Sequence, residues 1–366
     1  MRHWGKTNAN RTMKPIHRLA IVPRALVGAA LLLSAEAASW AGRPLEEYEF
    51  SLRFPAAITR FAPYGDVAAL GGAQAASEYS SSNNPASAAW PHPERKYAKS
   101  FSPQFTTVRF AESLDLFVTA QAVAIDAGGW GSFLPAAAQI RSNRAEDSSG
   151  LGFRFDAEVY QFQWARRVGE KTTLGANFNA TYSNIRYYDR ALGEVVRSRS
   201  DAYDIRLGLV REFLPRLRVG AVVDYGWSPA WTDTLGFDFS TFRFKKLRTR
   251  DTTHQVLWRL GLTWEYADGS DLYLDYSGGT FSNDDGTLLV HRFSLGIEQQ
   301  LIKDILFGRV GVTLDTRGEV SLTAGLGVTL GTRASLDLAY QHNSFPEIRK
   351  EFGQAQSFVA SVGLGF

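Results

Sequence analysis

The sequence contains no cysteine and only two methionines among its 366 residues. Without cysteine there are no disulfide bonds and no thiolate metal sites. The six histidines are scattered without the spacing of a zinc site, so neither a metal nor another cofactor is expected. No run of about eighteen apolar residues follows residue 41, which excludes membrane-spanning helices from the rest of the chain. The many GxG repeats lack the context of a phosphate-binding loop.

The formal net charge of +3 comes from the N-terminal segment. Residues 1–41 hold six of the 40 basic residues and one of the 37 acidic residues, so 34 basic and 36 acidic residues follow. The remainder is therefore slightly acidic, and no nucleic-acid partner is indicated.

Residues 1–41 have the features of a secretory signal peptide. A basic stretch precedes the apolar run at residues 25–33, and small residues provide cleavage sites near Ala37 or Ala41. The run is too short to cross a bilayer as a helix. Met13 is a second candidate start, because residues 13–41 already form a complete signal. The alternative is an amphipathic surface helix.

The last ten residues alternate in the manner of a strand. Phe358, Ala360, Val362, Leu364 and Phe366 share one face, and the opposite face is mostly small. A soluble sheet rarely ends on such an edge, whereas closing a barrel removes the edge. The segment resembles the C-terminal signal strand of bacterial outer-membrane proteins, with Leu364 and Phe366 in the terminal apolar-x-aromatic positions. That resemblance implies a barrel assembly machinery that recognises this C-terminal strand.

The same alternation recurs from residue 97 onward, for example at residues 174–182, 217–225, 256–266 and 320–330. Repeats of this kind, about ten residues long and separated by turns, predict an all-β fold. The predicted fold is a transmembrane antiparallel up-and-down β-barrel of about fourteen strands, over residues 97–366. With the C-terminus in the periplasm, the long connections fall on the outer side. The pattern is weakest at residues 97–110, and residues 235–246 are interpreted as a hairpin extension above the membrane.

Residues 42–96 are rich in small residues and lack sustained alternation. Gly71 and Gly72 permit close backbone approach, and Asn84-Pro85 is a turn signal. Residues 69–73 (ALGGA) followed by residues 84–86 (NPA) resemble the hatch motif of FadL-type and PorV-type outer-membrane barrels. The resemblance implies that residues 42–96 fold inside the barrel and occlude it. A turn-rich linker is the alternative.

The face of the strands that is predicted to line the lumen carries charges of both signs. The numbers of positive and negative charges are nearly equal. Because buried charges need partners, this favours ion pairs that brace the wall over a selective aqueous pore. The candidates are Arg206, Arg218, Arg259, Arg292, Arg309, Asp204, Asp224, Glu265, Asp275 and Glu298.

The predicted third strand contains a proline. Pro135 cannot donate a ladder hydrogen bond, and Gly128, Gly129 and Gly131 let the chain bend nearby. FadL-type channels have a kinked third strand that opens the wall sideways, which implies an opening at Pro135 with Phe133 and Leu134 beside it. The alternative is a harmless proline at a strand start or in a loop.

His342 and Ser344 allow a different interpretation, a lipid esterase at the outer rim, with Glu347 or Glu351 orienting the imidazole. Phe345 departs from the His-x-Ser-Asn pattern of such enzymes, so a histidine of the aromatic girdle is favoured and no enzymatic activity is expected.

The leading functional interpretation follows from the FadL-like resemblance: uptake of hydrophobic, fatty-acid-like small molecules across the outer membrane. The second is a non-transporting, PorV-like scaffold of a secretion apparatus. A continuous pocket between hatch and wall would favour transport, and a filled interior would favour the scaffold. Expected partners are outer-membrane lipid, the barrel assembly machinery and a hydrophobic ligand.

Overall fold

The computed structural model describes residues 49–61, 65–77, 83–89, 99–111, 114–146, 151–238, 240, 242–315, 317–331 and 333–366. The predicted signal peptide, its cleavage site and the first residues of the predicted hatch lie outside the described residues. Among the described residues no helix is long and apolar enough to cross a membrane.

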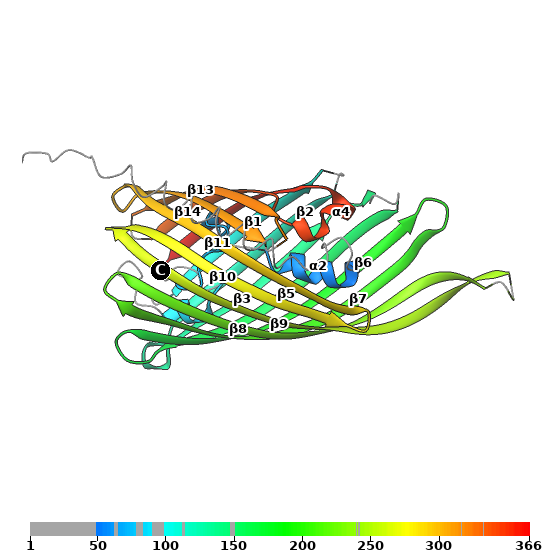
Figure 1. Cartoon of the computed structure of the whole chain (residues 1–366), viewed down its shortest axis with the longest axis horizontal. Helices are drawn as coiled ribbons and strands as arrows, with labels where there is room; N and C mark the ends of the chain where they lie inside the picture. Colours follow the sequence, from blue (N-terminus) through cyan, green and yellow to red (C-terminus); the bar gives the residue numbers. More distant parts are fainter. Residues whose placement is uncertain are drawn as a thin grey trace, which may run out of the picture.

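Fourteen strands form a closed antiparallel barrel, as the alternation predicts (Figure 1). Each strand pairs with its neighbours in sequence, and β1 pairs with β15 to close the ring. The strands are β1 (Lys99–Phe110), β2 (Asp115–Asp126), β3 (Ser132–Ser142), β5 (Gly152–Arg167), β6 (Thr172–Asp189), β7 (Gly193–Leu214), β8 (Leu217–Asp238), β9 (Arg243–Ala267), β10 (Ser270–Asn283), β11 (Gly286–Ile302), β12 (Leu306–Asp315), β13 (Val320–Leu330), β14 (Ala334–His342) and β15 (Ala355–Gly365).

A short fifteenth strand, β4 (Ala145–Glu146), lies outside the ring and pairs with the first residues of β5. The weakly alternating residues 97–110 form β1 over almost their whole length. The extension predicted at residues 235–246 is also present. Pairing of β7 with β8 stops at Val196 and Thr234, and β8 and β9 continue as an isolated hairpin to Asp238 and Arg243 (Figure 1).

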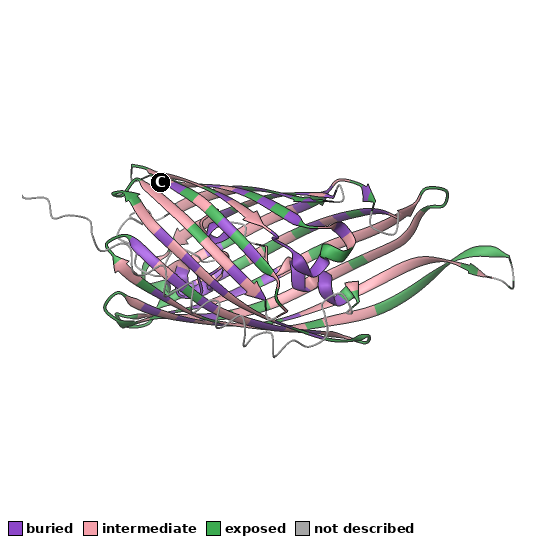
Figure 2. Ribbon diagram, turned by 45° about the horizontal axis from the view of Figure 1, so that its top comes forward, coloured by how far each residue is buried: buried purple, intermediate pink, exposed green. Residues whose placement is uncertain are grey.

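The outward faces of the strands expose large apolar side chains. Leu207, Leu260 and Leu326, which lie within β7, β9 and β13, are 53%, 57% and 51% exposed. Exposed and less exposed residues alternate along the ribbons in Figure 2. An apolar exterior around a closed barrel suits a hydrocarbon environment, because a closed ring pairs the backbones of neighbouring strands and leaves no open edge.

Short helices precede the first strand and lie in two of the connections between strands. Inside the ring are α2 (Phe50–Ile58), α3 (Gly65–Ala69) and the 3-10 turn η3 (Pro85–Ala89). The connection between β14 and β15 adds η5 (Pro346–Ile348) and α4 (Arg349–Phe352), and η4 (Gly128–Trp130) forms the turn between β2 and β3. Phe54 of α2 packs edge-on against Phe155 at 4.9 Å, within an apolar cluster that includes Phe345 and Phe352. This cluster places α2 under the β14–β15 connection, at the end of the barrel opposite the C-terminus.

Candidate functional site

The described residues from α3 to η3, 65–77 and 83–89, lie across the lumen and are bonded to several strands of the wall. The Ala75 backbone N–H donates to Asp275 Oδ2 at 2.8 Å, and Thr313 Oγ1 donates to the Gly71 carbonyl at 2.8 Å. Asn84 Nδ2 donates to the Leu209 carbonyl at 2.9 Å and to the Ala75 carbonyl at 2.6 Å. The residues of the predicted hatch motif are therefore contact residues of the lumen wall.

Glycines of the wall make room for this segment. A Cβ atom at Gly220 would lie 1.9 Å from the Ala75 carbonyl oxygen, and one at Gly208 would lie 2.1 Å from Asn84 Oδ1. Gly175 and Gly311 face Ala86 and Leu70 in the same way, with nearest backbone atoms 2.4 and 2.5 Å away. Within the segment, Gly71 and Gly72 have φ of 64° and 78°, which an L side chain rarely adopts. Small wall residues thus form the seat of the segment.

Most of the predicted lumen arginines pair with carboxylates. Arg206 bonds Asp224 at 2.8 Å, and Arg218 lies 3.4 Å from Asp271. Arg309 bridges two strands, because its guanidinium bonds both Glu298 and Asp337 at 2.5 Å. Asp204 accepts a hydrogen bond from Asn179 Nδ2 at 2.6 Å, whereas Glu265 makes no side-chain hydrogen bond within the described part of the chain. These pairs join strands that are adjacent in the ring or separated by one strand, across the inside of the wall.

Charged side chains also fasten α2 and the turn after it to the β14–β15 connection. Glu347 Oε1 accepts hydrogen bonds from Arg60 Nε at 2.6 Å and from Arg292 Nη2 at 2.8 Å, and Arg292 Nη2 also donates to the Ala56 carbonyl at 3.0 Å. Burial acts to raise the pKa of the Glu347 carboxyl, but Arg60 and Arg292 more than offset it and hold that pKa below its usual range. Glu347 therefore stays ionised and keeps the helix docked.

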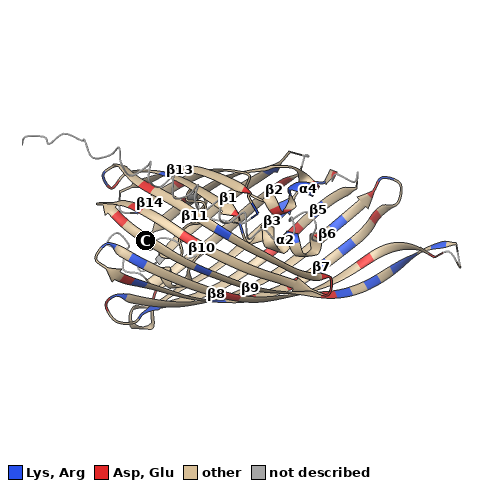
Figure 3. Cartoon of the chain, viewed as in Figure 1, with Lys and Arg blue, Asp and Glu red and all other residues tan. Residues whose placement is uncertain are grey.

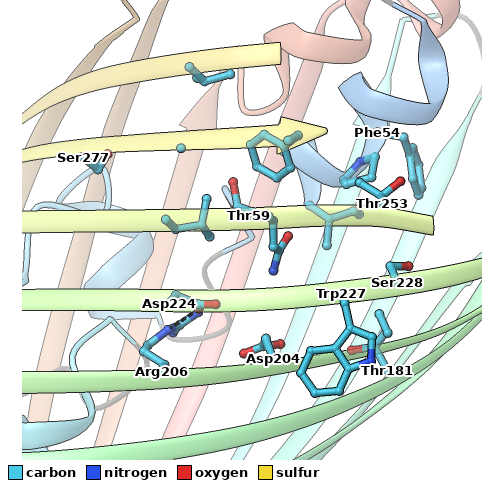
Figure 4. A pocket seen from close by; sticks show the side chains of 18 of the residues that line it. Phe54, Thr59, Thr181, Asp204, Arg206, Asp224, Trp227, Ser228, Thr253 and Ser277 are labelled. Atoms are coloured by element: carbon cyan, nitrogen blue, oxygen red, sulfur yellow. Dashed lines mark hydrogen bonds and ion pairs between the residues drawn. The ribbon is translucent and has the colours of Figure 1, made fainter. Parts of the chain in front are cut away.

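A cavity of about 280 Å³ lies between α2 and the strands from β5 to β11 (Figure 4). Its volume is near the lower end of the roughly 300–1,000 Å³ typical of small-molecule sites. One part of the lining is apolar and the other polar. The apolar part includes Phe54, Ile58, Phe155, Trp227, Leu257 and Phe281, and the polar part includes Thr59, Asp204, Arg206, Asp224, Arg259 and Arg292.

Arg259 is the exception among the lumen arginines. It makes no ion pair and no side-chain hydrogen bond with the described residues, and its Nη1 atom is enclosed without a partner. Arg206 and Arg292, which line the same cavity, are both engaged by carboxylates. An enclosed guanidinium N–H group without a partner is costly, so Arg259 is the cavity residue best placed to receive an acceptor from a ligand.

Three strand prolines interrupt the ladder without shifting the register. Each leaves two successive residues unpaired on one side: Pro103 toward β15, Pro135 toward β2 and Pro229 toward β7. On the other side each proline is paired, with Gln121, Phe162 and Thr252 respectively. The shared cause is the missing N–H donor. Because all three behave alike, an interruption alone does not identify an opening in the wall.

The position of the cavity distinguishes Pro229 from the other two prolines. Ser200, Ala202, Tyr203, Trp227 and Ser228 line it, and these residues surround the interruption at Pro229. No residue of β2 or β3 lines it. Gly128, Gly129 and Gly131 lie in and beside the η4 turn, at the end of the barrel where the chain's C-terminus lies. Phe133 and Leu134 are the second and third residues of β3, which follows this turn. Beside Pro135 the pairs of β2 with β3 resume at Phe133 in the same register, so the predicted opening there stays a prediction.

The predicted His342–Ser344 pair is not assembled. Asn343, with φ of 55°, turns the chain so that His342 contacts Gln354 outside the wall while Ser344 is buried and bonded to Ser357 at 2.7 Å. Glu347 is engaged by Arg60 and Arg292, and Glu351 by Arg53, so neither carboxylate is available to orient the imidazole. The geometry gives no support to an esterase at this rim.

Two features of the site lie outside the sequence prediction. Pro229 lies in the middle of β8 and carries the same signal as Pro135, a proline inside an alternating strand. Phe54 and Ile58 of α2 form part of the cavity wall, and only their apolar character in an otherwise small-residue segment marks them in the sequence. The lumen arginines were predicted, but the absence of a partner for Arg259 depends on side-chain placement.

No protein-family model and no curated protein sequence matches the chain. Solved structures do. The Ralstonia pickettii toluene transporter TbuX superposes with a TM-score of 0.56 at 16% identity, over 83% of this chain and 98% of that one. The CymD monoaromatic hydrocarbon channel gives 0.58 at 14% identity, again over 83% and 98%. A Pseudomonas aeruginosa FadL homologue gives 0.54 at 9% identity over the same shares. With the lumen segment and its seat of glycines, these likenesses establish that the chain has the fold of the FadL-type outer-membrane barrels.

Proposed function

We propose that this protein is an outer-membrane channel for the uptake of small hydrophobic molecules. The observation that carries the proposal is the cavity between α2 and the wall, with Phe54, Phe155 and Trp227 on its apolar side. A filled interior would favour a scaffold role, whereas an open, partly apolar space next to a lumen segment suits transit of a ligand. The structural neighbours are named as transporters and channels, which fits this class of activity.

Within that class, we propose that the preferred ligands carry a carboxylate, as fatty acids do. The apolar side of the cavity would hold the hydrocarbon part of the ligand. Arg259 supplies a half-buried guanidinium whose Nη1 atom is enclosed and which no described carboxylate neutralises by an ion pair. A carboxylate there would gain charge-assisted hydrogen bonds, which contribute about 1.5–3 kcal/mol each.

The test compares an acid with its hydrocarbon counterpart. Purified protein in liposomes would be assayed for uptake of 4-phenylbutyrate and of butylbenzene, with wild type, Arg259→Gln and Arg166→Gln. Arg166 is exposed near the C-terminal end of β5 and is the matched control. Arg259→Gln is expected to lower uptake of the acid about tenfold and to leave butylbenzene unchanged, since about 1.4 kcal/mol corresponds to a factor of ten.

The two parts of the proposal fail in different ways. If neither compound enters faster than in protein-free liposomes, the transport function is wrong and the scaffold role is favoured. If both enter and Arg259→Gln has no selective effect, transport stands and the carboxylate preference is wrong.

The route through the wall is expected to pass Pro229 rather than Pro135, because the cavity reaches the ladder interruption at Pro229. Valine at position 229 would restore the missing donor toward β7 and close the ladder. Pro229→Val should therefore slow uptake of butylbenzene several-fold, while Pro135→Val slows it less. Barrel stability should be equal or higher in both, which heat-modifiability on gels would check. If Pro135→Val slowed uptake more than Pro229→Val, the route would instead pass the interruption in β3.

A further inference from the structure

The outward face of β5 to β9 carries two transverse rows of charge near the end opposite the C-terminus. The register aligns Arg154, Arg186, Arg197, Asp233 and Arg248 as one row, each residue directly opposite the next. Two residues nearer the middle of the barrel, Asp156, Asn184, Arg199, Trp231 and Arg250 form the second row. Together the two rows are called the arginine belt here. Figure 3 shows Lys and Arg gathered at this end of the long strands and along the hairpin.

Side chains of the arginine belt share a face with the lipid-facing residues. Four residues further toward the middle, Tyr203, Trp227 and His254 are aligned on the same face, and the Tyr203 and Trp227 rings are 5.6 Å apart. Below them come Ile205, Tyr225 and Val256, which are 46%, 47% and 39% exposed. Aromatic rows of this kind lie at the headgroup level of a bilayer. The belt is therefore just above the aromatic row, where lipid headgroups continue outward.

The belt has more positive charge than its own carboxylates neutralise. Asp156 is shared by Arg154 at 3.1 Å and Arg186 at 3.5 Å, and Asp233 accepts two hydrogen bonds from Arg248, at 2.7 and 3.1 Å. Arg199 and Arg250 make no hydrogen bond or ion pair within the described part of the chain, and Arg250 lies over the Trp231 ring at 5.6 Å. Arg197 reaches Asn184 at 3.4 Å and forms no ion pair with a described residue. Three guanidinium groups, two on β7 and one on β9, which flank β8, are thus left for an external anion.

Neighbouring charges limit where that anion can lie. Glu158 and Asp201 occupy the next row toward the middle of the barrel, between the belt and the aromatic row. Lys246 is one position further out than Arg248 on the same face of β9 and is exposed. An anion is repelled by Glu158 and Asp201 on the inner side and attracted by Lys246 on the outer side of β9, while Glu194 lies further out on β7. The favoured position is therefore against Arg197, Arg199 and Arg250 at the height of the belt.

We infer that the arginine belt binds the phosphate groups of an anionic glycolipid in the outer leaflet. This rests on the proposed outer-membrane location and not on the identity of the transported compound. Planar guanidinium groups match phosphate oxygens with paired hydrogen bonds, and arginine is the residue best suited to this recognition. A lipid is favoured over a soluble anion because the belt borders the lipid-facing surface directly, so acyl chains would lie on Tyr225 and Val256 while the phosphates meet the belt.

The experiment uses native mass spectrometry and vesicle binding with the full mature chain. Probes are diphosphorylated lipid A and lipid A from which both phosphates have been removed. Variants are the triple substitution Arg197→Gln, Arg199→Gln, Arg250→Gln, and a matched control with Arg166→Gln, Arg211→Gln and Arg333→Gln. The three control arginines are exposed near the other end of the barrel, so the total charge change is the same.

Wild type and the control are expected to bind the diphosphorylated lipid at least tenfold more tightly than the dephosphorylated one, and added salt should reduce this preference. The belt variant should lose the preference while it remains folded and heat-modifiable. Equal preference in the belt variant and the control would overturn the inference. So would wild-type binding that does not depend on the phosphates, since the surface would then serve another partner, such as an acidic protein. If the lipid preference persists while uptake fails, the proposed function alone is wrong.

Discussion

Removal of residues 42–96 is expected to raise the single-channel conductance in planar bilayers at least tenfold. The described part of this segment crosses the lumen and bonds to β7, β10 and β12 through Asn84, Ala75 and Gly71. Without it, a ring of fourteen strands would approach the size at which barrels hold an aqueous channel. Unchanged conductance in protein that inserts normally would show that these residues do not occlude the pore.

A single substitution tests the same point without deletion. Gly220→Val would place its Cβ atom 1.9 Å from the Ala75 carbonyl oxygen, a backbone atom that cannot rotate away. The lumen segment must therefore move from its seat, with an overpacking cost of about 1–3 kcal/mol or more. Gly363→Val is the matched control, because a Cβ atom there meets the Ser335 hydroxyl, which can rotate. Gly220→Val should increase conductance or its fluctuations strongly, and Gly363→Val should not.

Deletion of Phe366 is expected to lower the yield of membrane-inserted, heat-modifiable protein about tenfold or more. Phe366 follows β15, the strand that closes the ring against β1, and its side chain is 66% exposed. Its loss removes little packing inside the barrel, so a large effect would have to arise during assembly, as expected if the terminal aromatic is an assembly signal.

The matched control is deletion of Phe242, another exposed aromatic, at the tip of the β8–β9 hairpin and 79% exposed. Both variants lose one apolar side chain of the same kind. Equal yields from the two deletions would contradict an assembly role for Phe366 and would show that it is an ordinary residue of the lipid-facing surface.

The barrel itself was predictable because strand alternation is a local property of sequence. Residues such as Leu207 and Leu260 face lipid while Arg206 and Arg259 face the lumen, and a period of two is enough to assign these faces. The strand count and the hairpin at residues 235–246 follow from the same pattern. The register that aligns Arg197 with Asp233 and Arg248 does not, because it depends on the shear of the closed ring.

The candidate site was less predictable, since it depends on contacts between distant segments. Asn84-Pro85 identified the lumen segment, but the glycines opposite it, on four different strands, have no signal of their own in the sequence. Pro135 and Pro229 carry equal signals, and the position of the cavity beside Pro229 distinguishes them. His342 and Ser344 were separated by the turn at Asn343, whose positive φ depends on the surrounding fold.

Photolabelling with a hydrophobic aryl diazirine, followed by mass spectrometry of the peptides, tests most directly whether a hydrophobic ligand occupies the cavity. Labels are predicted on α2 at Phe54 and Ile58 and on β9 at Leu257, which packs against α2 inside the ring, and excess unlabelled butylbenzene should suppress them. Labels confined to lipid-facing residues such as Leu260 and Leu326, and insensitive to the competitor, would contradict the proposed function.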